Sequence, residues 1–346
     1  MIDGGHKLAV FAHGSHAIGL GHLYRVRALL QTLRRQAPEV AVLILLNDDP
    51  VAAAVFAADP AQIVSGNPMQ FGDWGARALR AFAPTVALHD ALDAQSEILP
   101  VLREHAVRLI TVDDTSELAR RQCDLRVNVL YQTPTRAGDP PTWSDLGAIF
   151  IDETFAAAAN DYKVRNLGTR VLVSQGGADT FGQVPQIVAA LRQLPKIYLH
   201  VVIGRAFSHD RALDAAIGGD ARVTVHRDVA DMAGLMLQCD IAVSGGGVTL
   251  FELAAVGVPT IAITAEPREL ETMARFSVPG LIVDLGLARP FPVAKLAMET
   301  KALLEDYRRR RQLGQRCRAT VNGRGLERIC GVLLGAPINA AGVVRR

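Results

Sequence analysis

The sequence is poor in aromatic residues and cysteine, and it has no long hydrophobic run. Aromatic residues make up 5% of its 346 residues, although 49% are hydrophobic, so aliphatic side chains must form most of the core. Such cores suit parallel sheets, whose strands are covered on both faces and read as apolar runs. Because no stretch approaches the roughly 18 uninterrupted apolar residues of a membrane-spanning helix, we expect no integral membrane span.

Charge and cysteine spacing exclude further classes of protein. The formal net charge of +2 is too small to indicate a nucleic-acid partner. The 4 cysteines show no metal-ligand spacing, so we expect buried free thiols in a reducing cytoplasm and no metal site. The apolar run Leu8–Ala12 is too short for a signal peptide, which also favours a cytoplasmic location.

Segments typical of strands alternate with helical patterns along most of the chain, which indicates βαβ units and parallel sheets. The expected strands are Leu8–Ala12, Val40–Leu46, Gln62–Val64, Thr85–Leu88, Arg108–Val112, Leu125–Val129, Arg170–Ser174, Tyr198–Ile203, Arg222–His226, Ile241–Ser244, Thr260–Thr264 and Leu281–Val283. The expected helices lie near 22–37, 50–58, 73–83, 95–105, 115–121, 183–194, 229–238, 249–256, 268–277, 292–317 and 323–334.

The alternation breaks between about 130 and 167, where Pro134, Pro140 and Pro141 favour a loop or linker. A chain of this length is natural for two domains. We predict an α/β fold with two Rossmann-like domains, 1–150 and 151–335, whose parallel sheets face a central cleft, followed by a flexible tail, 336–346. Ligands of such sheets bind just beyond the carboxyl ends of the strands.

One expected strand leads into three consecutive glycines within Ser244–Gly247. Glycines let an anion approach the backbone, and free N–H groups at a helix start favour a phosphate. Thr249 adds a hydroxyl, either as a helix cap or as a phosphate donor, and Glu252 offers a carboxylate to two ribose hydroxyls. The alternative is a tight structural turn with a capping box formed by Thr249 and Glu252.

A second strand in the same half ends at Ser174 and runs into Gly176 and Gly177. We expect this turn to neighbour Ser244–Gly247. In the first half, Asp113 and Asp114 follow one strand and Asp90 follows another; N-capping of the next helix is the favoured interpretation for Asp114.

The turn after the first expected strand contains Gly19, Gly21 and His22. The glycines allow close approach of a ligand, and a helix N-terminus favours the neutral imidazole that a general base needs. We therefore interpret His22 as the base, with His13 and His16 as alternatives on the same loop. Arg25 either binds an anionic group of the ligand or pairs with a surface carboxylate.

Three motifs together resemble the GT-B glycosyltransferase superfamily: Gly19-Leu-Gly-His22-x-x-Arg25, Val173-Ser-Gln-Gly-Gly-Ala-Asp179, and Ser244-Gly-Gly-Gly-Val-Thr-Leu-Phe-Glu252 followed by Gly257-Val-Pro259. Within this superfamily the sequence is most similar to the UDP-sugar hydrolase of pseudaminic acid biosynthesis, and the glycosyltransferase that makes lipid II is a wider relative. Asp113-Asp114 and Asn322–Arg328 extend the resemblance over nearly the whole chain.

The resemblance implies a GT-B-like fold whose C-terminal domain binds a nucleotide-sugar and whose N-terminal domain supplies the catalytic His22, without metal or cofactor. Glu252 would hold the ribose, and the turn from Gly246 to Thr249 would hold the diphosphate. The expected substrate-binding residues are Gly21, Arg25, Asp90, Ser174, Gly176, Gly177, Ser244, Gly245, Gly246, Gly247, Val248, Thr249 and Glu252.

Two stretches depart from the pattern of the hydrolases. Their Asp-x-Tyr reads Asp90-Ala91-Leu92 here, and a Gln-containing stretch reads Ala265–Glu271, with carboxylates in place of an amide.

We predict a UDP-sugar hydrolase in which His22 activates a water that breaks the anomeric C–O bond, in bacterial surface-glycan or nonulosonic-acid-type sugar biosynthesis. The alternatives are a GT-B glycosyltransferase with the same site and a non-catalytic nucleotide-sugar binding protein. An oxidoreductase is disfavoured because Tyr24 stands where the third glycine of a dinucleotide site belongs.

Overall fold

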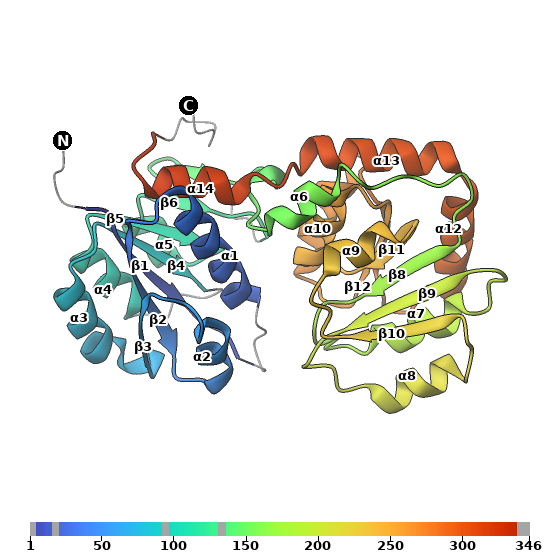
Figure 1. The fold of residues 1–346 in the computed structure, drawn as a ribbon, viewed down its shortest axis with the longest axis horizontal. Coiled ribbons are helices and arrows are strands. Elements are labelled where there is room, and N and C mark those ends of the chain that lie inside the picture. Colours follow the sequence, from blue (N-terminus) through green and yellow to red (C-terminus); the bar gives the residue numbers. More distant parts are fainter. Residues whose placement is uncertain (1–4, 16–20, 92–96, 131–135, 338–346) are drawn as a thin grey trace. The chain divides into compact units, whose positions relative to one another are not determined.

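The computed structural model describes residues 5–15, 21–91, 97–130 and 136–337. The chain forms two compact units, one of Met1–Asp152 with Arg324–Arg346 and one of Glu153–Gly323 (Figure 1). Each unit contains one parallel sheet with helices packed on it, which confirms the expected α/β class. In the described part of the chain, no helix is long and apolar enough to cross a membrane.

The first unit is built around a sheet of seven parallel strands in the order β3-β2-β1-β4-β5-β6-β7. Its strands are β1 (Lys7–Ala12), β2 (Ala41–Asn47), β3 (Gln62–Gly66), β4 (Val86–Asp90), β5 (Arg108–Val112), β6 (Leu125–Val127) and β7 (Thr142–Trp143). Its helices are α1 (Gly21–Gln36), α2 (Pro50–Phe56), α3 (Phe71–Phe82), α4 (Ile98–His105), α5 (Glu117–Gln122) and α14 (Gly325–Leu333), with short 3-10 turns at Pro68–Gln70 and Leu146–Ala148.

The second unit has a parallel sheet of six strands in the order β10-β9-β8-β11-β12-β13. Its strands are β8 (Arg170–Ser174), β9 (Tyr198–Ile203), β10 (Val223–Arg227), β11 (Ile241–Ser244), β12 (Thr260–Thr264) and β13 (Val283–Leu287). Its helices are α6 (Glu153–Ala158), α7 (Gln183–Leu191), α8 (Asp210–Ile217), α9 (Met232–Leu237), α10 (Val248–Val256), α11 (Glu269–Ser277), α12 (Val293–Glu305) and α13 (Tyr307–Thr320).

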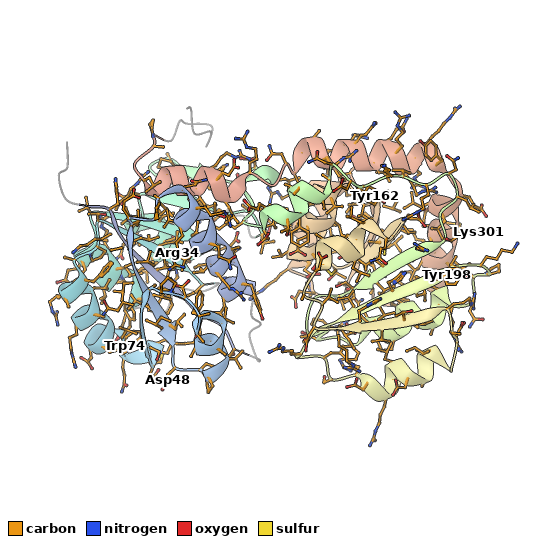
Figure 2. The ribbon with its side chains drawn as sticks, in the orientation of Figure 1. Arg34, Asp48, Trp74, Tyr162, Tyr198 and Lys301 are labelled. Carbon is orange, nitrogen blue, oxygen red and sulfur yellow. The ribbon has the colours of Figure 1, made fainter. Side chains whose placement is uncertain are left out.

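Helices cover both faces of the central strands, so these strands appear in the sequence as apolar runs. In the first unit, α3 and α4 cover one face of the sheet and α1 the other (Figure 1). In β1, every residue from Leu8 to Ala12 is buried. Helices also pack on the sheet of the second unit (Figure 1). Tyr162 is buried in that unit, and its hydroxyl donates to the carbonyl of Asp240 at 3.2 Å (Figure 2).

The last helix differs from the expected domain division. The sequence assigns 151–335 to the second domain, whereas α14 belongs to the first unit. It packs against α1, and Arg328 donates to the carbonyl of Gly147 at 2.7 Å. The chain therefore returns to the first unit after Gly323, and hydrophobic periodicity alone does not reveal which sheet a helix will cover. The tail from 338 onward lies outside the described residues.

Local details also differ from the expected elements. The single helix expected over 292–317 is two helices, because Asp306 caps the second one by accepting from the backbone N–H of Arg309 at 2.9 Å. The sequence prediction also missed α6, α8 and the short strand β7. These elements are short, so their periodicity is weak.

Candidate functional site

Each sheet has a topological switch point, where chain connections run outward in opposite directions. In the first unit it lies between β1 and β4, and in the second between β8 and β11. Crevices at the carboxyl ends of such strand pairs are the usual ligand sites of open parallel sheets.

His22 and Asp90 meet at the switch point of the first unit. Asp90 is the last residue of β4 and the register partner of Ala12, which ends β1; His22 is the second residue of α1. The Nδ1 atom of His22 lies 2.6 Å from Oδ1 of Asp90. The imidazole is 15% exposed and the carboxylate is fully buried. Because an ionised carboxylate only accepts, this hydrogen bond requires the proton on Nδ1, and the neutral imidazole of that tautomer has on Nε2 the lone pair that a base needs.

Arg25, one helical turn beyond His22, holds the buried carboxylate in place. Its Nε donates to Oδ2 of Asp90 at 2.9 Å and its Nη2 to Oδ1 at 2.5 Å, while its Nη1 donates to Asp113. Burial opposes the ionisation of Asp90, but the charge of Arg25 and the hydrogen bonds from Arg25 and His22 outweigh it and lower the pKa of Asp90 to about 2. Asp90 therefore stays ionised and fixes the orientation of the imidazole.

Asp113 anchors this network to the neighbouring strand. Its Oδ1 accepts from the backbone N–H groups of Val129 at 2.7 Å and Leu130 at 2.8 Å, immediately after β6. Asp113 also has a positive φ of 51°, which few side chains adopt without compensation. Its hydrogen bonds to the backbone and to Arg25 supply that compensation. Sequence reasoning named Asp113 but gave it no role in the site.

The contacts of three residues in the first unit differ from the sequence-based expectations. We expected Arg25 and Asp90 to bind substrate, but Arg25 is 5% exposed and Asp90 is fully buried. Their polar atoms are directed at each other and at His22 and Asp113. In this position the two side chains orient His22. Asp114 is not the N-cap of α5 either, since Ser116 is, although Asp114 accepts from the N–H of Ser116 at 2.9 Å.

The loop after β1 carries His13 and is held by Asn47. The side chain of Asn47 accepts from the N–H of Gly14 at 3.1 Å and donates to its carbonyl at 3.0 Å. Burial lowers the pKa of His13, and the neighbouring His22 lowers it further, so His13 favours the neutral form. His16 and Gly19 lie outside the described residues. Gly21 is exposed at the start of α1, with open space where a Cβ would stand.

The two glycine turns of the second unit follow neighbouring strands, as expected. Ser174 and Ser244, the last residues of β8 and β11, are register partners. Gly176 has a φ of +72°, a backbone conformation that favours glycine. A Cβ on Gly176 or Gly177 would meet nothing within 4 Å, so the turn is open to an incoming group.

The triple-glycine turn already contains an anion, the carboxylate of Glu269. Its Oε2 accepts from the N–H of Gly246 at 2.9 Å and from the hydroxyl of Thr264 at 2.6 Å. A Cβ on Gly246 would stand 2.8 Å from the Cβ and the carbonyl oxygen of Glu269, so α11 needs a glycine there. The only sign of this contact in the sequence was the stretch Ala265–Glu271, which has carboxylates where the hydrolases have an amide. The turn thus accommodates a carboxylate oxygen, to which the N–H of Gly246 donates.

The remaining expected residues lie on α10, which follows the turn. The helix begins at Val248 with Gly247 as its N-cap, so Thr249 is not the cap that the sequence suggested. Val248 and Thr249 are partly exposed in the first turn of α10, and Glu252 is partly exposed one turn later. The structure therefore places the residues expected to bind the nucleotide at the carboxyl ends of β8 and β11 and on α10.

Comparisons with known proteins agree with this architecture. No family model matches the sequence. The chain is 25% identical over 339 residues to the spore coat polysaccharide biosynthesis protein SpsG of Bacillus subtilis (strain 168), covering 94% of this chain and 97% of that protein.

Solved structures resemble the chain along nearly its whole length. Acinetobacter baumannii MurG matches with a TM-score of 0.71 at 12% identity, covering 96% of this chain and 99% of that one. Anabaena Alr3699/HepE, solved in complex with UDP and glucose, matches with a TM-score of 0.61 at 15% identity, covering 95% and 99%. These likenesses establish the fold, and the protein has a GT-B-like α/β architecture of two Rossmann-like units.

Proposed function

We propose that the protein is a GT-B-type glycosyltransferase that transfers a sugar from a nucleotide-sugar, a UDP-sugar, to an acceptor hydroxyl. The observation that carries the proposal is the contact of 2.6 Å between His22 Nδ1 and Asp90 Oδ1. It provides an oriented base at a strand end where such sheets bind ligands. Support also comes from the similarity to SpsG, named for polysaccharide biosynthesis, and from the UDP and glucose bound by Alr3699/HepE.

In this proposal the first unit activates the acceptor. Nε2 of His22 takes the proton of the acceptor hydroxyl as its oxygen attacks the anomeric carbon of the sugar. The imidazolium that forms is stabilised by Asp90, which lies against Nδ1 and is kept ionised by Arg25. A bond from the anomeric carbon to the acceptor oxygen forms while the bond to the diphosphate breaks.

The second unit receives the leaving group. The electron pair of the broken bond goes to an oxygen of the diphosphate, which gains negative charge. The N–H groups of the turn Ser244–Gly247 and the N-terminus of α10 stabilise that charge. Glu252, partly exposed on α10, is the proposed ribose ligand, and the open turn at Gly176 and Gly177 is the proposed neighbour of the phosphates.

Hydrolysis of the UDP-sugar is the second candidate. The motif that resembles the hydrolases joins Gly21, His22 and Arg25, and the structure places the latter two in one hydrogen-bonded network with Asp90. The same base can take a proton from water or from a sugar hydroxyl. The two functions therefore differ in the attacking oxygen and share the rest of the site.

A turnover experiment tests the proposal and separates the candidates. Purified protein is incubated with a panel of UDP-sugars, with and without soluble saccharide acceptors, while UDP and free sugar are quantified. A transferase releases UDP in proportion to glycosylated acceptor, and a hydrolase releases free sugar without acceptor. His22→Ala should reduce turnover by roughly 10²–10⁴-fold, whereas His6→Ala, at an exposed position before β1, should not. Full turnover of His22→Ala would overturn the proposed mechanism.

A further inference from the structure

The carboxylate of Glu269 occupies the position that the proposed function gives to a phosphate. Glu269 is the first residue of α11, and its Oε2 accepts from the N–H of Gly246 at 2.9 Å. Its Oε1 would stand 3.2 Å from a Cβ on Gly247, and its Oε2 would stand 3.0 Å from a Cβ on Gly245. The side chain therefore reaches along all three glycines of the turn.

This position is set by packing and by a second hydrogen bond. The main chain of Glu269 lies so close to Gly246 that a Cβ there would stand 2.8 Å from its carbonyl oxygen and 2.9 Å from Cγ of Met273. The hydroxyl of Thr264, which ends β12, accepts from the N–H of Glu266 at 2.9 Å and donates to Oε2 of Glu269 at 2.6 Å, which is shorter than its 3.4 Å contact with the carbonyl of Glu266. The carboxylate is therefore held at the turn by two neutral donors.

An N–H group that is bonded to one anion is not free for another. A diphosphate that uses the N–H of Gly246 must first displace Glu269, and the displaced carboxylate then stands near a second negative group and loses its donors. Like charges at this range repel, and a carboxylate without donors is costly. The hydroxyl groups of an attached sugar are donors that can replace those lost, whereas a free nucleoside diphosphate has no sugar on its terminal phosphate, and the hydroxyls of its ribose are assigned to Glu252.

We propose that Glu269 makes the site discriminate between a nucleotide-sugar and the free nucleoside diphosphate that the reaction leaves behind. Glu269 competes with the product for the glycine turn and returns to that turn as the product departs. The nucleotide-sugar loses less affinity, because the hydroxyl groups of its sugar donate hydrogen bonds to the displaced carboxylate. This inference rests on the proposed function, since it assigns the turn to a diphosphate.

Binding measurements on matched variants test the proposal. UDP and a UDP-sugar that the protein turns over are titrated by calorimetry into Glu269→Ala, Glu269→Gln and Glu271→Gln, each in a His22→Ala background that blocks turnover. Glu271 is exposed in the first turn of the same helix, so its variant controls for the loss of charge. We expect Glu269→Ala to bind UDP roughly ten- to a hundredfold more tightly, the range of one hydrogen bond to a charged group.

The Gln variant keeps the test valid if the Ala variant folds poorly. Its amide oxygen still accepts from Gly246 but carries no charge, so its affinity for UDP should rise by a smaller factor than that of Glu269→Ala. The preference for the UDP-sugar over UDP should fall in both variants and persist in Glu271→Gln. Unchanged UDP affinity in both variants would overturn the role of Glu269 and leave the proposed function standing. Failure of every variant and of the parent to bind any nucleotide would overturn the proposed function itself.

Discussion

The carboxylate of Asp90 lies 2.6 Å from Nδ1 of His22, although the two residues are 68 positions apart in the sequence. The contact exists because Asp90 ends β4, which pairs with β1, and His22 begins the helix that follows β1. Asp90 is fully buried and His22 is partly exposed, so the carboxylate lies inside the protein and the imidazole reaches solvent. This arrangement is that of a base with its orienting group.

Replacing Asp90 by Asn should impair catalysis more than binding. The amide cannot stabilise an imidazolium, and it no longer holds the Nδ1–H tautomer. We expect kcat to fall at least about a hundredfold, with the affinity for UDP unchanged, because the proposed nucleotide residues are in the other unit. Steady-state kinetics and calorimetry on the same preparation measure both. Asp48→Asn, at an exposed position in the first unit, is the control; an unaltered kcat in Asp90→Asn would contradict the pairing.

Removing Arg25 should destabilise the first unit strongly. The guanidinium is buried between the carboxylates of Asp90 and Asp113, and its loss leaves both without their cation. Breaking a buried ion pair from one side typically costs about 3–5 kcal/mol, so Arg25→Ala should lower the free energy of unfolding by that order in denaturant titrations. Arg27→Ala, on the exposed face of the same helix, should change it little. Equal stability of the two variants would show that the buried network does not hold this unit together.

The depressed pKa of Asp90 predicts a loss of stability in acid. Arg25 and His22 lower this pKa to about 2, from an unfolded value of about 3.9. Because the folded state binds the proton less readily than the unfolded state, ionised Asp90 stabilises the fold. This contribution to the free energy of unfolding is complete above about pH 4 and is lost as the pH falls through about 2. Urea unfolding of the parent and of Asp90→Asn, compared at steps of pH, should show a stability difference that shrinks in this window. A difference that is constant with pH would contradict the assigned ionisation.

Two glycine substitutions should have opposite outcomes. In Gly246→Ala the new Cβ would stand 2.8 Å from the backbone carbonyl of Glu269, so α11 or the turn must move. Overpacking of this kind typically costs about 1–3 kcal/mol, and displacement of the turn should also weaken UDP binding. Gly177→Ala, where a Cβ meets nothing within 4 Å, should fold with nearly parental stability. Thermal unfolding with and without UDP measures both effects, and full tolerance of Gly246→Ala would show that the turn adapts freely.

Much of the fold follows from local features of the sequence. Arg108–Val112, Arg170–Ser174, Ile241–Ser244 and Thr260–Thr264 are strands with the expected bounds. Strands buried on both faces are continuous apolar runs that stand out from the polar segments around them. The glycine turns were predictable for the same reason, because each directly follows such a run.

Residue types determined the candidates for the chemistry, and tertiary structure determined their roles. Arg25 and Asp90 were expected to meet a ligand, but the order of the strands brings them to each other and to Asp113. Glu269 reaches Gly246 only because β12 lies beside β11 and α11 packs on the turn. The sequence by itself determined the strands and glycine turns, since these depend on neighbours along the chain. Only the tertiary structure decided which distant side chains share a hydrogen bond, because that depends on strand order and helix packing.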